Sequence, residues 1–205
     1  MQYQMPTNGD GTIIDANCLI NASLKHGDRK LHHPHCDSLH NFVGICCAHS
    51  YTIAYYPNIE GEARANLSNA VWQLSERKNV TNYYVVRAYS KSAEKNLNSL
   101  LPMLIKLEDK SEPSEIQSIK QEFKQHIDTL IQSREYSGKG VPGDVDCSVI
   151  CSIRKESWMR PFILSDDGHF THPQHFPFIE KTYGIIIIPA NDLGTRINYS
   201  NWPAE

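Results

Sequence analysis

The apolar residues of this chain come in short runs, and this limits the folds that are open to it. The longest aliphatic run, at residues 185–188, has the length of a β-strand, whereas a membrane-spanning helix needs about 20 consecutive apolar residues. The chain has 205 residues, of which 40% are hydrophobic, so it can bury most of its apolar surface around one core. We therefore expect a single domain over residues 1–205 and no membrane partner.

Helices are expected where apolar residues recur every three or four positions. Residues 62–76 and 114–133 show this spacing, and a further helix is expected over residues 92–108. Because Pro113 separates the last two, we predict a helical hairpin or insertion over residues 92–138.

The C-terminal third instead shows strand-like patterns. Residues 145–153 alternate in strand fashion, residues 161–164 follow after a short break, and residues 183–189 are expected to form a central strand. Earlier in the chain, strands are expected at 51–56 and 80–89.

Residues 1–16 are polar and rich in turn formers, so we expect a lead-in there without a strand. The resulting fold prediction is α+β. A helical N-terminal half with the helical hairpin packs on a mostly antiparallel C-terminal sheet.

The charge pattern argues against a nucleic-acid partner. There are 20 Lys and Arg residues against 23 Asp and Glu, which gives a net charge of −3, and no Lys/Arg stripe is evident. Residues 1–6 lack the basic and apolar regions of a secretory signal. We therefore expect a cytoplasmic protein, or an effector secreted without a Sec signal, with six reduced cysteines. The oligomeric state stays open.

The leading candidate for catalysis is Cys18, which opens a short predicted helix over residues 18–24 that Asp15 or Asn17 could cap. The free N–H groups and positive dipole of a helix N-terminus lower the pKa of a thiol and offer an oxyanion site. This placement suits a cysteine nucleophile; the alternative is a small buried cysteine in an apolar helix.

The segment Asp15-Ala16-Asn17-Cys18-Leu19-Ile20-Asn21-Ala22 resembles the Asp-Gly-Asn-Cys-Leu-Phe-x-Ala nucleophile segment of ovarian-tumour-type deubiquitinases. More loosely, it is similar to the cysteine helix of papain-like peptidases and bacterial effector deamidases. The resemblance implies a cysteine hydrolase that attacks an amide or isopeptide bond of a protein substrate, and it implies no required cofactor.

The resemblance also implies a histidine base from the later sheet. Many papain-like effectors have a His-Trp pair at the place where this chain reads Glu156-Ser157-Trp158, so the base is expected from His169, His172 or His175. We favour His169, which directly follows the Asp-Gly turn. Asn191 or Asp192 would then orient its imidazole.

A second candidate site is a histidine- and cysteine-rich segment. Zinc is held by imidazole and thiolate, and Cys36 with His40, or Cys46 with His49, are spaced so that both side chains could reach one ion. The segment suggests a structural zinc ion, and a non-catalytic, zinc-stabilised binding module is the alternative function. The other interpretation is a polar loop with buried thiols.

A third candidate is the carboxylate pair Asp144 and Asp146, with Asp166 or Asp167 later in the chain. Two carboxylates at alternate positions of a strand can hold a divalent cation. This arrangement would suit a metal-dependent nucleotidyltransferase, although a Gly-Asp pair is also common in plain turns.

Overall fold

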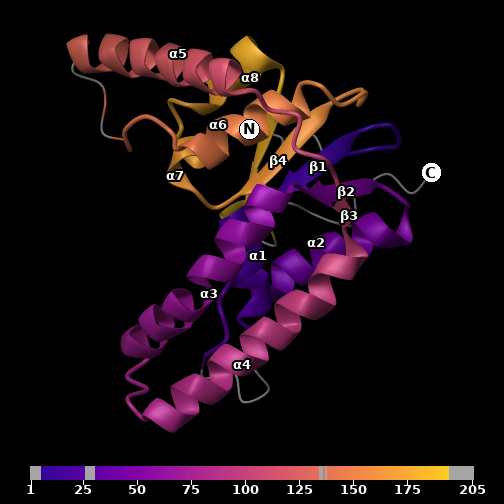
Figure 1. Cartoon of the computed structure of the whole chain (residues 1–205), viewed down its shortest axis with the longest axis vertical. Helices are drawn as coiled ribbons and strands as arrows, with labels where there is room; N and C mark the ends of the chain where they lie inside the picture. The colour runs from indigo at the N-terminus through magenta and orange to yellow at the C-terminus, as the bar shows by residue number, and fades with distance from the viewer. Residues whose placement is uncertain (1–5, 26–30, 134–135, 137, 194–205) are drawn as a thin grey trace.

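The computed structural model describes residues 6–25, 31–133, 136 and 138–193. In these residues a parallel sheet is packed between helices on both faces (Figure 1). The strands are β1 (Gly11–Ile14), β2 (Thr52–Tyr55), β3 (Ile105–Lys106), β4 (Pro161–Ser165) and β5 (Ile186–Pro189). Their order across the sheet is β3-β2-β1-β4-β5, and every neighbouring pair is parallel.

The helices fall into two groups. On one side of the sheet lie α1 (Ala16–Ser23), α2 (Cys36–Ala48), α3 (Pro57–Arg77) and α4 (Tyr83–Leu100). On the other side lie α5 (Pro113–Gln132), α6 (Asp144–Ile153) and α8 (Phe176–Tyr183). The short elements are α7 (Gly168–Thr171) and the two 3₁₀ turns η1 (Leu101–Met103) and η2 (Ala190–Asp192).

The prediction of a mostly antiparallel C-terminal sheet is wrong. Each connection between consecutive strands contains a helix. A helical crossover brings the chain back to the end of the sheet at which the previous strand began, so the next strand runs parallel to it. Residues 11–14 were expected to lie in a strandless lead-in, yet they form β1 at the centre of the sheet. The strand expected to be central, β5, lies at one edge.

Two predicted strands are helices. Residues 83–89 belong to α4, in which Val86, Tyr89, Ala93 and Leu97 lie on one buried side at helical spacing. Residues 145–153 belong to α6, whose residues from Cys147 to Ile153 are all buried. A helix that is buried all round has no polar stripe, so its apolar run resembles that of an inner strand.

The predicted hairpin over residues 92–138 is also divided differently. Helix α4 packs chiefly on α3, while α5 packs on α6 on the other side of the sheet (Figure 1). We call α3 and α4 together the arm. The hydrophobic core lies between the sheet and the helices that cover it.

In the described residues, no helix is long and apolar enough to cross a membrane. The start of the chain, on which the expectation about secretion depends, lies outside the described residues.

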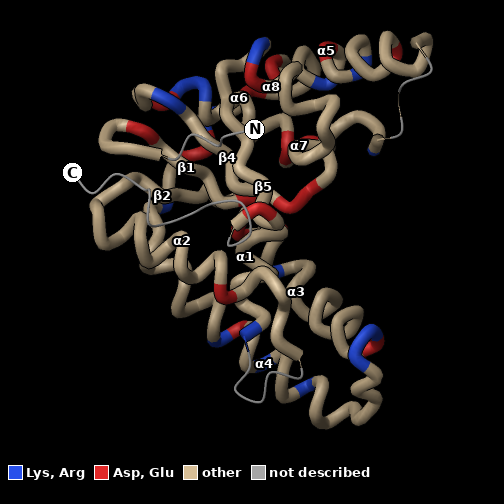
Figure 2. The backbone as a smooth tube through the Cα atoms, turned by 180° about the vertical axis from the view of Figure 1, so that it is seen from behind, with Lys and Arg blue, Asp and Glu red and all other residues tan. Residues whose placement is uncertain are grey.

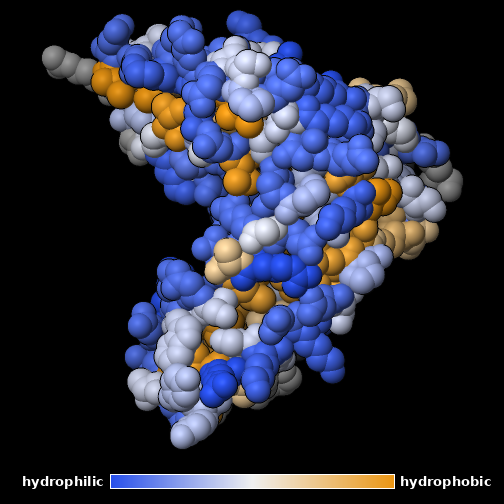
Figure 3. Space-filling model, in the orientation of Figure 1, coloured by the Kyte–Doolittle hydropathy of each residue, from blue (hydrophilic) through white to orange (hydrophobic). Residues whose placement is uncertain are grey.

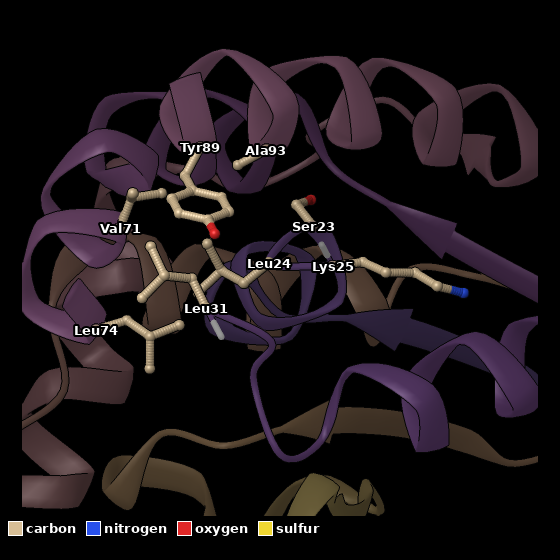
Figure 4. Close-up of a pocket in the computed structure, with 8 residues that line it drawn as sticks. All are labelled: Ser23, Leu24, Lys25, Leu31, Val71, Leu74, Tyr89 and Ala93. Atoms are coloured by element: carbon tan, nitrogen blue, oxygen red, sulfur yellow. The ribbon is translucent and has the colours of Figure 1, made fainter. Parts of the chain in front are cut away.

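Both helices of the arm are packed tightly on the end of α1. Figure 4 shows Val71, Leu74 and Tyr89 of the arm meeting Leu24 and Leu31 around a cavity of about 10 Å³. A cavity of this size holds about one water molecule, so these residues anchor the arm and do not form a ligand pocket.

Candidate functional site

The carboxyl ends of β1 and β4 meet at the point where the strand order reverses. From β1 the chain builds the sheet outward through β2 and β3, and then returns to the other side of β1 with β4 and β5. In open parallel sheets, ligands bind outside the carboxyl ends of the strands at such a switch point. Here Asp15 follows β1, and Asp166 and Asp167 follow β4.

Two buried aspartates lie at opposite ends of β1, and their surroundings differ. Asp10, at the amino end, is 2% exposed and pairs with Arg160, whose Nη2 lies 2.6 Å from its Oδ2. Asp15, at the carboxyl end, is 6% exposed and has no cationic partner among the described residues. A buried carboxylate without a counter-charge is costly, and this one needs a functional reason.

Asp15 is held in place by neutral donors. Its carboxylate caps α1 by accepting from the backbone N–H of Ala16 at 2.7 Å, and it accepts from the Ser165 hydroxyl at 2.8 Å. Burial raises the pKa of Asp15 to about 7, although the bond from Ser165 lowers it, and the nearby charges of Asp146 and Asp167 raise it further. The side chain is therefore fixed in position and poorly neutralised.

Asp167 caps the short helix α7 and is rich in donors. It accepts from the His169 backbone N–H at 2.7 Å, from Lys139 Nζ at 2.9 Å and from Asn17 Nδ2 at 3.3 Å. Burial alone would raise its pKa, but the hydrogen bonds from His169 and Lys139 hold the pKa well below its ordinary value. Its neighbour Asp166 accepts from Asn21 Nδ2 at 3.0 Å, and burial raises its pKa.

His169 lies between two of the carboxylates. Its Nδ1 is 3.2 Å from Oδ2 of Asp146, in the first turn of α6, and 3.0 Å from Oδ1 of Asp167. The carboxylate of Asp146, followed by that of Asp167, raises the pKa of His169 to about 9. The ring is thus a cation at neutral pH and supplies counter-charge to both groups.

A fourth element adds Glu62, from the second turn of α3. Burial raises the pKa of Glu62, and the charges of Asp146 and Asp167 raise it further, which places the three carboxylates within electrostatic reach of one another. We call the following residues the acidic cluster: Asp15, Glu62, Asp146, Asp166 and Asp167. Figure 2 shows acidic positions gathered between α7 and α1, and Figure 3 shows that the molecule is hollowed between the arm and the α5–α8 part.

A polar groove continues from the acidic cluster along α1 and α3. It encloses about 270 Å³ and includes Asn17 and Asn21, the same residues that bond Asp167 and Asp166. Further along, α3 contributes Asn66, Asn69, Gln73 and Arg77. We call this the amide groove, because amide side chains, which both donate and accept, dominate its polar lining.

The structure does not give Cys18 the properties expected of a nucleophile. Its side chain is 0% exposed, and burial, followed by the charges of Asp15 and Asp166, raises the pKa of the thiol well above its ordinary value. The predicted lowering of this pKa is therefore wrong: at this helix N-terminus, burial and two neighbouring carboxylates outweigh the dipole.

The other members of the predicted catalytic set are scattered. His169 contacts Asp146 and Asp167, whereas His172 and His175 pack with Tyr136 in an aromatic group. Asn191 and Asp192 lie in η2, after β5 at the edge of the sheet. No hydrogen bond joins Cys18 to a histidine in the described part of the chain.

The proposed zinc ligands lie along α2 and at its C-terminal end, and the two predicted pairs are far apart. Cys36 Sγ and His40 Nε2 meet at the same acceptor, the Ala22 carbonyl, at 3.1 and 2.9 Å. Cys46 follows Cys36 by about 15 Å of helix rise, and His49 stacks on Tyr51 at the far end. The four side chains therefore do not converge on one point in this conformation.

The carboxylate pair Asp144 and Asp146 is divided as well. Asp144 is 71% exposed and pairs with Lys120 on the outside of α6, whereas Asp146 turns toward His169. Because α6 is a helix and not a strand, residues two positions apart point in different directions. Only Asp146 belongs to the acidic cluster.

In the described residues, no three His, Cys, Asp or Glu side chains are already arranged to hold a metal ion. The chemistry of the acidic cluster nevertheless fits a hard divalent cation, since Mg²⁺, Mn²⁺ and Ca²⁺ prefer carboxylate oxygens. Its fit rests on Asp15, which is buried and lacks counter-charge.

Comparisons with known proteins found no match: neither a scan against protein-family models nor searches of curated proteins and of solved structures detected a similar protein. The resemblance to ovarian-tumour-type and papain-like enzymes thus stays a prediction from one short segment.

Proposed function

We propose that this chain is a divalent-cation-dependent nuclease, which hydrolyses phosphodiester bonds of single-stranded nucleic acid at the acidic cluster. The observation that carries the proposal is Asp15, buried at the switch point with its pKa raised to about 7 and with Asp146, Asp167 and Glu62 around it. An arrangement of this kind is costly for the fold, and a bound cation would offset that cost.

The residues divide the work by their positions. Asp15 and Asp167 come from the ends of adjacent parallel strands and would hold the cation, with Asp146 and Glu62 completing an oxygen-rich set. A divalent cation held there would stabilise negative charge on the phosphate and would lower the pKa of a bound water molecule. Ser165 fixes the cluster, since its hydroxyl donates to Asp15 and accepts from the backbone N–H of Asp167 at 2.9 Å.

His169 supplies positive charge to the cluster in the absence of a metal. Its ring lies between Asp146 and Asp167, so both carboxylates become available to another cation when the imidazole turns away. Lys139, which is half exposed, neutralises Asp167 from the outside.

The amide groove supports nucleic acid as the substrate class. Amide groups recognise the hydrogen-bonding edges of unpaired bases, and the groove leads directly from the acidic cluster through Asn17 and Asn21. The net charge of −3 argued against a nucleic-acid partner. However, the acidic cluster alone contributes five negative charges to this sum when its carboxylates are ionised. The charge over the remainder of the molecule is therefore not acidic.

The proposal is tested by incubating the intact chain with end-labelled, unstructured RNA and DNA oligonucleotides in Mg²⁺, in Mn²⁺ and in EDTA. We expect cleavage with a divalent cation and none in EDTA. Asp15→Asn and Asp167→Asn should each lower the cleavage rate by about 100-fold or more, because each removes a charged oxygen ligand.

Asp144→Asn is the matched control, since it removes an aspartate that lies outside the acidic cluster. Cys18→Ala separates this proposal from the cysteine hydrolase. Both variants should cleave at the wild-type rate. Metal-independent cleavage, or loss of cleavage in Cys18→Ala alone, would contradict the proposal, as would a purified chain that cleaves neither polymer under any cation.

A further inference from the structure

The arm differs in charge from the rest of the molecule. Residues 57–100, which span the arm, contain six Lys or Arg residues and four Glu residues, whereas in the whole chain the acidic residues are in excess. Figure 2 shows basic positions on both helices of the arm. The molecule therefore has an acidic centre and a basic projection.

Basic side chains from both helices of the arm line one shallow hollow. Arg64 of α3 and Arg87 and Lys91 of α4 surround a space of about 330 Å³, together with Glu94. Arg64 pairs with Glu60 at 2.9 Å and donates to Asn98 at 2.8 Å. In the part of the chain that is described, neither Arg87 nor Lys91 forms an ion pair.

The same face ends in exposed aromatic rings near the tip of the arm. Arg64, Ser68 and Trp72 follow one another at intervals of four residues on α3, as Tyr83, Arg87 and Lys91 do on α4, so each set forms one stripe. Trp72 is 39% and Tyr83 54% exposed, and their ring centroids lie 5.9 Å apart.

We propose that this basic face of the arm, formed by Arg64, Ser68, Trp72, Tyr83, Arg87 and Lys91, binds a single-stranded nucleic acid, with the cations on its phosphates and the aromatic rings stacked on its bases. Surfaces that bind single strands combine a positively charged track with aromatic platforms in this way. The chemical class of the ligand rests on the proposed function; the site itself is separate from the amide groove.

The two regions are connected through α3. Glu62 of the acidic cluster and Arg64 of the basic face are two residues apart at the start of this helix, and the amide groove lies along its other side. Because residues two positions apart on a helix point in different directions, a strand held on the basic face has to pass around the start of α3 to reach the acidic cluster. The arm then increases the local concentration of substrate there.

The test measures binding of a fluorescent, unstructured oligonucleotide to the intact chain by anisotropy, in EDTA so that no cleavage occurs. Arg87→Gln with Lys91→Gln should weaken binding and make the slope of log K against log salt shallower by about 1.4, because each phosphate contact contributes about 0.7. Trp72→Ala should weaken binding by about 5- to 150-fold, the range for loss of one base stack.

Lys124→Gln with Lys181→Gln is the matched control, since it removes two exposed cations outside the arm. This variant should keep wild-type affinity and salt slope, and thermal unfolding of all variants shows whether they fold. The proposal is overturned if the arm variants bind like wild type, if the control loses as much affinity, or if the arm variants change self-association in sedimentation instead.

Hydrolysis of bis-p-nitrophenyl phosphate by the intact chain tests the proposed function separately, because this small diester is too short to reach from the acidic cluster to the aromatic rings. Metal-dependent hydrolysis of the diester without oligonucleotide binding would refute the basic face and leave the nuclease site intact. Oligonucleotide binding that depends on the arm, without hydrolysis of any diester, would refute the nuclease alone.

Discussion

At the level of single residues, the difference between Asp10 and Asp15 is the most informative feature. Burial would raise the pKa of Asp10, but Arg160 and Thr7 hydrogen-bond its carboxylate and the pKa lies below its ordinary value. Asp15 has only neutral donors, and its pKa is raised to about 7. One aspartate therefore stabilises the fold as an anion, and the other opposes it.

The first prediction concerns the stability of Asp15→Asn without metal. Because the pKa is 3.8 for an ordinary aspartate and about 7 in the fold, the folded state keeps a proton between these values that the unfolded state has lost. Wild-type stability should thus fall as the pH rises from about 4 to 7. At pH 8 in EDTA the asparagine variant should be more stable by roughly 2–4 kcal/mol, and near pH 4 the gain should vanish, as measured by urea unfolding.

Asp10→Asn is the control with the opposite sign. It removes the buried charge that faces Arg160, so this variant should lose roughly 1–3 kcal/mol at pH 8. A destabilised Asp15→Asn at pH 8 would show that the Asp15 charge is compensated in the fold.

The sequence identified parts of this site but not the whole of it. Asp146 with Asp166 or Asp167 was predicted as part of a divalent-cation site, whereas Asp15 was predicted only as a helix cap. Glu62 was missed because a glutamate in the first turns of an amphipathic helix is indistinguishable from any solvent-facing acid. Only the parallel sheet, which brings residues about 150 positions apart into contact, unites them.

At the level of elements, α3 and α5 were predictable from the sequence, whereas the first part of α4 and the whole of α6 were not. Helices α3 and α5 were found within a few residues because their apolar stripes alternate with polar ones. Helix α6 has no such alternation, and β1 is a four-residue strand between turn formers. Because the prediction lacked β1, it lacked the central strand of the sheet, and it placed the remaining strands next to one another in antiparallel order.

The second prediction concerns the close approach of β1 to Trp158. A Cβ added at Gly11 would lie 1.9 Å from the Trp158 ring, so Gly11→Ala forces the indole or the strand to move. We expect a loss of about 1–3 kcal/mol, measured by urea unfolding. Gly44→Ala, in the interior of α2 with open space around the added carbon, should instead gain about 0.5–1 kcal/mol. Equal effects of the two substitutions would contradict this packing.

At the level of the whole molecule, the two ends of the parallel sheet differ in charge. At the amino ends of β1 and β4, Asp10 and Arg160 form a neutral pair, whereas the carboxyl ends collect the acidic cluster. The arm then adds a basic face beside this cluster. The concentrated negative charge is thus confined to one end of the sheet, and the fold tolerates it there.

The third prediction is that a divalent cation stabilises the whole fold. A ligand that binds only the folded state raises the unfolding free energy, by about 2.7 kcal/mol at a concentration 100 times Kd. At pH 8, Mn²⁺ should therefore raise the melting temperature of the wild type but not that of Asp167→Asn. Asp144→Asn should respond like the wild type, and an equal Mn²⁺ effect on all three proteins would place the binding site elsewhere.

The pairing of β1 with β4 has a consequence during synthesis. The first strand made is the middle of the finished sheet, and one of its two neighbours begins at Pro161. A growing chain that has not yet reached this residue carries β1 with one side open, and the ribosome must deliver Ser165 and Asp167 before Asp15 has its companions. Such a chain cannot assemble the acidic cluster until it has been translated at least as far as Asp167.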